Sequence, residues 1–233
     1  MYTRVADGRE LELRVSGKLY KDALVMFDRE TGTLWTQVDG SALGGPLAGR
    51  RLVEVPAMQT SWKVWKRLHP DTLVLRKPAT LRGSPYADYF ADPGRRGLFG
   101  TRGDKRLDGK ALIVGVHAGD DAVAVPLSAL EKRPVIEVEL VGEPLLVFYS
   151  REEQTAAVFR ATLEGRRLSF RVRKAGKQTF LEDAETGSRW SPLEGRAVEG
   201  PLQGKRLEAV PYVRSYWYAW SAYRPRTRLA AGP

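Results

Sequence analysis

Alternating apolar and polar residues recur along most of the chain and predict β-strands. The stretches ALVMFD (23–28) and TFLED (179–183) are typical of half-buried strands, and each is followed by the turn residues of a D-x-E-T-G sequence. Three further stretches predict hairpins: 111–127 with AGDD at its tip, 135–150 turning at 141–143, and 156–173 turning at Glu164-Gly165. The chain is therefore expected to be mostly β.

Two short segments have the spacing of helices instead. QTSWKVWKRLHP (59–70) predicts a helix that Thr60 or Ser61 caps and Pro70 ends. Trp62 and Trp65 are three residues apart and share one helical face, which we expect to pack on a sheet. The alternative interpretation is an aromatic platform for a ligand. YWYAWSAYRP (216–225) repeats the pattern near the C-terminus.

The two helical segments belong to a long internal repeat. Residues 28–75 align with 183–230 without a gap, and 19 of the 48 positions are identical. The shared positions include Asp28/Asp183, ETG (30–32 and 185–187), Trp35/Trp190, GPL-x-G (45–49 and 200–204), Trp62/Trp217 and Trp65/Trp220. Upstream, 7–15 matches 164–172 with a two-residue shift in spacing. This pattern indicates an internal duplication.

The predicted fold class is α+β, predominantly β, with an internally duplicated β-rich unit. A short Trp-x-x-Trp helix closes each copy. We expect the first copy at 1–77, a Gly/Pro/Arg-rich connection at 78–107, and the second copy with extra N-terminal hairpins at 108–230. The copies are predicted to superpose within one compact body, with Trp62 and Trp217 in equivalent buried positions.

Composition restricts the chemistry that this chain can perform. Of 233 residues, 42% are hydrophobic, which is typical of a folded protein. With no Cys, thiol nucleophiles and Cys-type zinc sites are excluded, and the two histidines, His69 and His117, do not suffice for a His zinc site. We therefore expect no cofactor and no bound transition metal. The chain has no apolar run that could span a bilayer and no signal peptide, so as written it is expected in the cytoplasm.

Charge raises the prospect of an anionic partner. The net charge is +10, and such a field favours nucleic acid or an acidic polymer. RRLSFRVRKAGK (166–177) places its arginines on one strand face, and 212–228 interleaves arginines with aromatic rings, as single-strand binders do. The candidate binding residues are Arg167, Arg171, Arg173, Tyr218, Arg224 and Arg226. The alternative interpretation is a solvated basic surface over a packed core.

Only two carboxylate pairs are duplicated. Asp28 with Glu30, and Asp183 with Glu185, could perform acid–base chemistry or hold a hard cation. A hydrolytic site would follow if the two pairs met in a cleft between the copies. Because each pair lies beside Thr-Gly in a turn, the alternative is that they accept hydrogen bonds from backbone N–H groups.

The two helices differ on their outer faces. Lys63, Lys66 and Arg67 of the first copy become Tyr218, Ser221 and Ala222 in the second. A face that loses charge and gains Tyr favours a protein contact, so the second helix is a candidate for self-association or for a partner. The alternative is that the chain itself covers this helix.

Several long motifs carry a resemblance to a known family. VSGKLYKDALVMFDRETGTLWTQVDGSALGGPLAGRRL, TSWKVWKRLHPDTLVL, and the second-copy words ETGSRW and GPLQGKRLEAVP resemble DUF3179, a bacterial and archaeal family of uncharacterised proteins. The resemblance implies no established activity. It also implies two features that are absent here: a Cys-Pro-Leu-Cys segment just before the position where this chain begins, and the signal peptide of many exported members.

Three functions follow as hypotheses. The leading one is a non-enzymatic binding or structural module. The others are a hydrolytic enzyme that uses the duplicated carboxylates, and a polyanion binder that uses the arginines named above.

Overall fold

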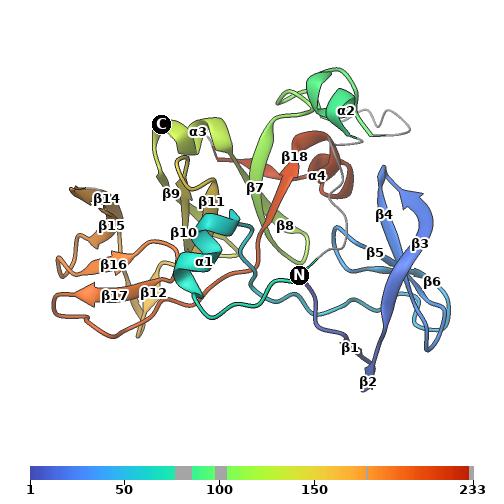
Figure 1. Cartoon of the computed structure of the whole chain (residues 1–233), viewed down its shortest axis with the longest axis horizontal. Coiled ribbons are helices and arrows are strands. Elements are labelled where there is room, and N and C mark those ends of the chain that lie inside the picture. Colours follow the sequence, from blue (N-terminus) through green and yellow to red (C-terminus); the bar gives the residue numbers. More distant parts are fainter. Residues whose placement is uncertain (77–85, 98–103, 177, 231–233) are drawn as a thin grey trace.

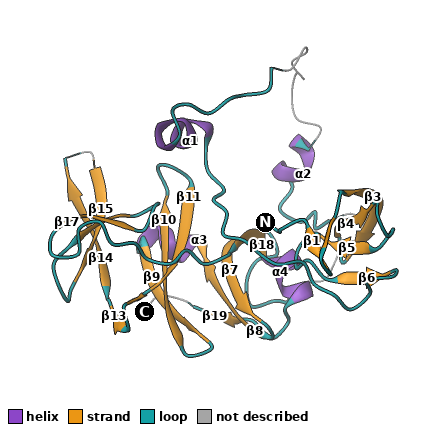
Figure 2. Cartoon of the chain, turned by 90° about the horizontal axis from the view of Figure 1, so that it is seen from below, coloured by secondary structure: helices purple, strands orange, loops and turns teal. Residues whose placement is uncertain are grey.

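The computed structural model describes residues 1–76, 86–97, 104–176 and 178–230, and it is mostly β. A four-stranded sheet lies at each end of the long axis, with the central sheets between them (Figures 1 and 2). The predicted fold class, predominantly β with short helices, is confirmed.

The first terminal sheet is an antiparallel meander in the order β3-β4-β5-β6. Its strands, with the small hairpin that precedes them, are β1 (Val5–Ala6), β2 (Arg9–Glu10), β3 (Leu13–Tyr20), β4 (Ala23–Asp28), β5 (Leu34–Thr36) and β6 (Ala42–Gly44). Trp35 is fully buried at its centre, packed among Leu11, Leu47 and Leu52. This sheet therefore has a small core of its own.

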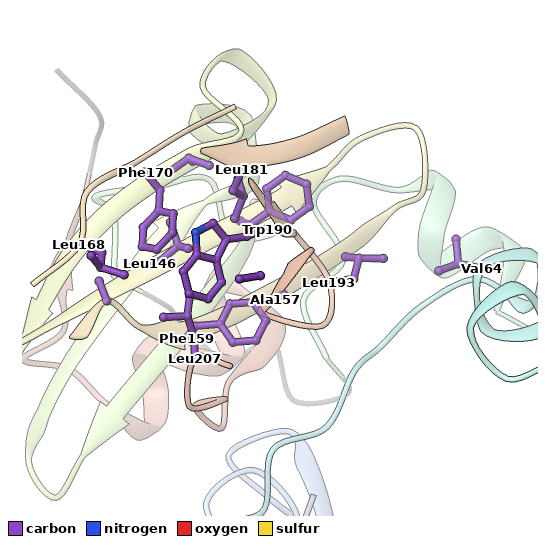
Figure 3. Packing of buried hydrophobic residues seen from close by; sticks show 14 residues of the cluster. Val64, Leu146, Ala157, Phe159, Leu168, Phe170, Leu181, Trp190, Leu193 and Leu207 are labelled. Carbon is purple, nitrogen blue, oxygen red and sulfur yellow. The ribbon is translucent and has the colours of Figure 1, made fainter. Parts of the chain in front are cut away.

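The second terminal sheet has the equivalent order, β14-β15-β16-β17. Its elements are β12 (Thr162–Leu163), β13 (Arg166–Arg167), β14 (Phe170–Ala175), β15 (Gln178–Asp183), β16 (Arg189–Ser191) and β17 (Arg196–Glu199). Trp190 lies in the middle of its core, with Phe159, Phe170 and Leu181 around the indole (Figure 3). Unlike the first core, this one continues into the central strands.

The two terminal sheets have equivalent backbone contacts at matching positions, each within its own unit. Leu11 donates its N–H to Arg4 O over 2.6 Å, and Leu168 donates to Ala161 O over 2.8 Å. The connecting strands form one isolated bridge each at the same place, Tyr2 with Glu54 and Phe159 with Ala209. The local geometry is therefore alike in the two units, while their origin by duplication stays a prediction.

The glycines of the GPL-x-G bends are held in the left-handed region. Gly45 has φ +107°, and a Cβ there would lie 2.8 Å from the Thr33 Cα. Gly49 has φ +82° but no heavy atom within 4 Å of a built Cβ. Only the first glycine is thus required both for its conformation and for space.

This difference gives a testable prediction. Gly49→Ala should destabilise the protein by about 1 kcal/mol, the cost of a left-handed non-glycine residue. Gly45→Ala should cost roughly 1 kcal/mol more, because its methyl group would overlap backbone that cannot move aside. Urea unfolding of both variants measures the two costs, and equal values would contradict the prediction.

The centre of the molecule consists of two sheets, ordered β11-β10-β9 and β18-β7-β8-β19. Their elements are β7 (Leu112–Ala118), β8 (Asp121–Pro126), α3 (Leu127–Lys132), β9 (Val135–Leu140), β10 (Glu143–Ser150), β11 (Thr155–Arg160), β18 (Val213–Tyr216) and β19 (Arg228–Leu229). The predicted hairpins at 111–127 and 135–150 are confirmed. The third hairpin is confirmed at its inner end, where β12 pairs with β13 around the turn, but its outer strands pair elsewhere, β11 with β10 and β14 with β15.

In the described residues, three helices lie around these sheets in addition to α3. They are α1 (Trp62–Leu68), α2 (Ala87–Ala91) and α4 (Trp217–Tyr223). The predicted cap of the first helix is confirmed, since the Ser61 side chain accepts a hydrogen bond from the Val64 N–H. α4 lies against the β7–β8 hairpin, whereas α1 stands to one side of the row of sheets (Figure 2).

Candidate functional site

The duplicated aspartates are buried and hydrogen-bonded within their own turns. Asp28 is fully buried and accepts the Trp35 indole N–H over 2.8 Å and the Thr31 N–H over 2.5 Å. Asp183 accepts the equivalent bonds from Trp190 over 2.8 Å and from Thr186 over 2.6 Å. Each carboxylate therefore ties its turn to the tryptophan at the centre of the core.

The neighbouring glutamates bind backbone in the same matched way. The Glu30 carboxylate accepts the Glu12 N–H over 2.8 Å, and the Glu185 carboxylate accepts the Ser169 N–H over 2.9 Å. This is the alternative that the turn sequence offered, in which the acidic side chains satisfy backbone donors.

Burial and hydrogen bonding act in opposite directions on the first aspartate. Burial alone would raise the pKa of Asp28, but hydrogen bonds from Trp35 and Thr31 outweigh it and leave the pKa below its ordinary value. A carboxylate held ionised in this way is suited to a structural role rather than to proton transfer. Asp28 ends β4 and Asp183 ends β15, so the two carboxylates lie in the sheets at opposite ends of the molecule (Figure 1).

The arginines of the basic strand are exposed and paired with glutamates. Arg171 Nε donates to Glu182 over 2.9 Å, and Arg173 lies 3.4 Å from the same carboxylate. Arg167 lies 3.4 Å from Glu137. Each of these arginines has a carboxylate nearby, which makes the three of them less suited to bind phosphate.

The C-terminal candidates are held by their own chain. Arg224 donates to the Gly119 carbonyl over 3.0 Å and lies over the Trp220 ring, and burial lowers its pKa. Arg226 lies 3.3 Å from Asp120 on the surface. The arginines of the two basic segments therefore contact different parts of the protein. Polyanion binding stays a prediction.

The second-copy helix is covered by the protein itself. Tyr218 is buried, its hydroxyl lies 2.9 Å from that of Tyr89 in α2, and burial raises its pKa. The Tyr216 ring stacks on it with centroids 6.1 Å apart. The expected partner surface on this helix is therefore occupied by intramolecular contacts, which was the alternative interpretation.

The two tryptophans of α4 form a small core with the β7–β8 hairpin. Trp217 and Trp220 are fully buried against Ile113, Ala122 and Ala124. A Cβ at Gly115 would lie 2.6 Å from the Trp220 ring, so the indole lies directly on the strand backbone. Trp217 Nε1 also donates to the Asp104 carbonyl over 2.8 Å.

The tryptophans of α1 are exposed, which corrects the prediction of equivalent buried positions. Trp62 is 52% exposed and Trp65 36% exposed. The helix instead buries Val64, on its other side, against the core around Trp190. The physical reason is that the β7–β8 hairpin covers α4, and no described strand pairs with the segments beside α1.

The exposed apolar surface continues past the helix. Trp65 Nε1 donates to Thr72 Oγ1 over 2.9 Å. The centroids of the His69 and Trp65 rings are 4.1 Å apart. After this turn Leu73, Val74 and Leu75 are all exposed. We define the α1 surface as Trp62, Trp65, Leu73, Val74 and Leu75.

Other sites offer less. A cleft of about 530 Å³ lies between the end of α1 and the second terminal sheet, but its arginines are paired, Arg67 with Glu153 at 2.5 Å and Arg189 with Glu199 at 2.7 Å. Among the described residues no group of three or more His, Asp or Glu is placed to hold a metal. None of the described helices is long and apolar enough to cross a membrane.

Comparison with known proteins identifies a family. A family model described as "Protein of unknown function (DUF3179)" matches residues 1–227. The chain belongs to the DUF3179 family. No curated protein and no solved structure matches this DUF3179 chain.

The leading sequence hypothesis for this DUF3179 protein did not include the α1 surface as an exposed patch, although the alternative of an aromatic platform covered Trp62 and Trp65. The Trp spacing was interpreted as a core stripe, because identical spacing in the other copy favoured identical burial. A signal was present all the same: Lys63 and Lys66 flank the tryptophans, and the Leu73-Val74-Leu75 run follows without a polar face.

Proposed function

We propose that this DUF3179 chain is a non-enzymatic protein-binding module and that the α1 surface is its binding face. One observation carries the proposal: Trp62 and Trp65 are exposed, while their counterparts Trp217 and Trp220 are fully buried. Tryptophan is enriched among residues that dominate binding energy. Exposed large apolar side chains gathered on one helix and the segment after it are typical of an interaction site.

The other two hypotheses have less support. Hydrolysis would need carboxylates that face a shared cleft, and Asp28 and Asp183 accept hydrogen bonds from their own turns instead. Polyanion binding is favoured by the net charge of +10. It is disfavoured by the glutamates that pair with Arg167, Arg171 and Arg173.

Site-specific photo-cross-linking in the natural host tests this proposal. A photoreactive residue in place of Trp62 should give a discrete adduct with another protein. The same group in place of Val15, which is 67% exposed on β3, is the matched control and should give none. Equal adducts at both positions, or none at position 62, would contradict the proposal.

A further inference from the structure

The surroundings of α4 define what a covered helix of this type contacts. β18 enters the helix and pairs antiparallel with β7, with Val213 opposite Gly115 and Tyr216 opposite Leu112. β19 leaves the helix and pairs parallel with β8, with Arg228 opposite Val123. The helix and its two flanking strands therefore enclose both edges of one hairpin.

α1 has the same framework, but no hairpin of the described residues lies against it. Its preceding residue Ser61 has φ −74° and ψ 153°, against −71° and 144° for Tyr216 before α4. The residues that end the two helices also agree, with φ −133° and ψ 75° for His69 and φ −130° and ψ 71° for Arg224.

The turn that follows each helix matches as well. Trp65 Nε1 donates to Thr72 Oγ1 and Trp220 Nε1 donates to Thr227 Oγ1, both over 2.9 Å. The α1 framework is therefore already in the conformation that α4 has when a hairpin covers it.

The segments on either side of α1 correspond to the flanking strands of α4. Residues 58–61 occupy the positions of β18, and Leu73 and Val74 occupy those of β19. In the described part of the chain neither segment is paired in a sheet. One side of 58–61 contacts the protein itself, since the Thr60 hydroxyl lies 2.7 Å from that of Thr155. An extended segment with an edge that no strand pairs is a site at which another chain adds a strand.

The hairpin against α4 also shows which residues fit beneath the tryptophans. Its helix-facing side is lined by Ile113, Ala122 and Ala124, and Gly115 lies under the Trp220 ring. The opposite side, with Val114, Val116, Val123 and Val125, packs into the central core. The strand alternation thus separates a small-residue side for the helix from a branched side for the core.

We propose that the partner of the α1 surface is a β-hairpin of another protein. This inference rests on the proposed function and specifies it. One partner strand pairs antiparallel with residues 58–61, and the other pairs parallel with Leu73 and Val74. A glycine of the first strand lies under Trp65, as Gly115 lies under Trp220. The partner covers the outer side of this hairpin with its own core.

A second copy of this chain is not the proposed occupant. Its equivalent hairpin is already covered by its own α4 and paired on both edges by β18 and β19. Offering that hairpin to α1 of a neighbour would expose Trp217 and Trp220 and gain only the same contacts.

A hairpin peptide tests the inference against the full chain. The probe is residues 110–128 with Val114, Val116, Val123 and Val125 changed to Thr, so that the core-facing side is soluble but keeps its β propensity. Terminal cysteines joined by a disulfide reduce the cost of ordering the free hairpin. Calorimetry should give saturable 1:1 binding, and backbone amide exchange should slow at 58–61 and 73–74 only.

Two matched peptide variants make the test specific. Gly115→Val should weaken binding at least about tenfold, because the added Cβ would overlap the Trp65 ring as it would overlap Trp220. Ala118→Val adds a similar side chain at an exposed position on the opposite side of the strand, and it should bind like the parent peptide. Trp65→Ala in the protein should abolish binding to either peptide.

The outcomes separate this inference from the proposed function. Binding without slowed amide exchange, or binding unaffected by Gly115→Val, would mean nonspecific adsorption. Either result would overturn the proposal that the partner is a β-hairpin. A dimer in sedimentation that Trp65→Lys dissociates would make a second copy the occupant. If circular dichroism finds the peptide unfolded, the test is the structure of the partner segment that cross-links to position 62. Two paired strands in that segment support the inference, and a helix overturns it. In that last case the proposed function still stands.

Discussion

Replacing Trp220 with alanine is expected to lower the free energy of unfolding by about 3–5 kcal/mol, the usual cost of removing a buried aromatic side chain. Trp220 is fully buried, lies on the backbone at Gly115, and donates its indole N–H to Thr227 over 2.9 Å. The substitution leaves a cavity between α4 and the β7–β8 hairpin, and the Thr227 hydroxyl loses the indole donor while it keeps its own bond to the Arg224 carbonyl. Urea unfolding measures the loss.

Trp65→Ala is the matched control for this prediction. Trp65 stands at the same place in its helix and makes the same indole bond to Thr72, but it is 36% exposed and no strand that the structure describes lies beneath it. Its removal should therefore cost about 1 kcal/mol or less. Similar losses for the two variants would mean that α1 is covered within the folded chain, which would also remove the basis for the binding face.

Local sequence was sufficient to predict the turns and the strands beside them, but not the pairing of the outer strands of 156–173. AGDD at 118–121 and the turn at 141–143 are formed by residues adjacent in the chain, so their chemistry decides their structure. The D-x-E-T-G turns are equally local, and the alternative in which the carboxylates accept backbone N–H groups was available from the sequence because Thr and Gly stand beside them.

Burial of the Trp-x-x-Trp helices could not be predicted in the same way. Periodicity identifies which residues share a helix face, but it does not identify what lies opposite that face. For α4 the covering element is a hairpin about 100 residues upstream in the chain, at 112–126. The identical Trp spacing of α1 carries no information about whether such a hairpin is present, and for this reason one prediction of burial was correct and the other wrong.

The internal hydrogen bonds of the turns have a second large energetic consequence. Asp28→Ala should destabilise the protein by about 3 kcal/mol, because the Trp35 indole, the Thr31 N–H and the Thr31 hydroxyl each lose an ionised acceptor while they remain inside the protein. Asp120→Ala is the control. The Asp120 side chain is 94% exposed and, among the described residues, forms an ion pair with Arg226, so its loss should change stability by less than about 1 kcal/mol.

The pH dependence identifies the ionised carboxylate as the cause. Because the folded pKa of Asp28 is depressed, the stability that it contributes is fully present above the unfolded value of about 4 and is lost as pH falls through the folded pKa. The difference between the wild type and Asp28→Ala should therefore shrink on acidification below about pH 4. Asp28→Asn separates charge from shape. The asparagine side chain has nearly the same shape but carries no charge, and when its oxygen accepts from Thr31 its NH2 group faces the Trp35 N–H. An unfolding difference that stays constant from neutral to acid pH would assign the loss to packing, and the turn carboxylate would then have no role as an ionised acceptor.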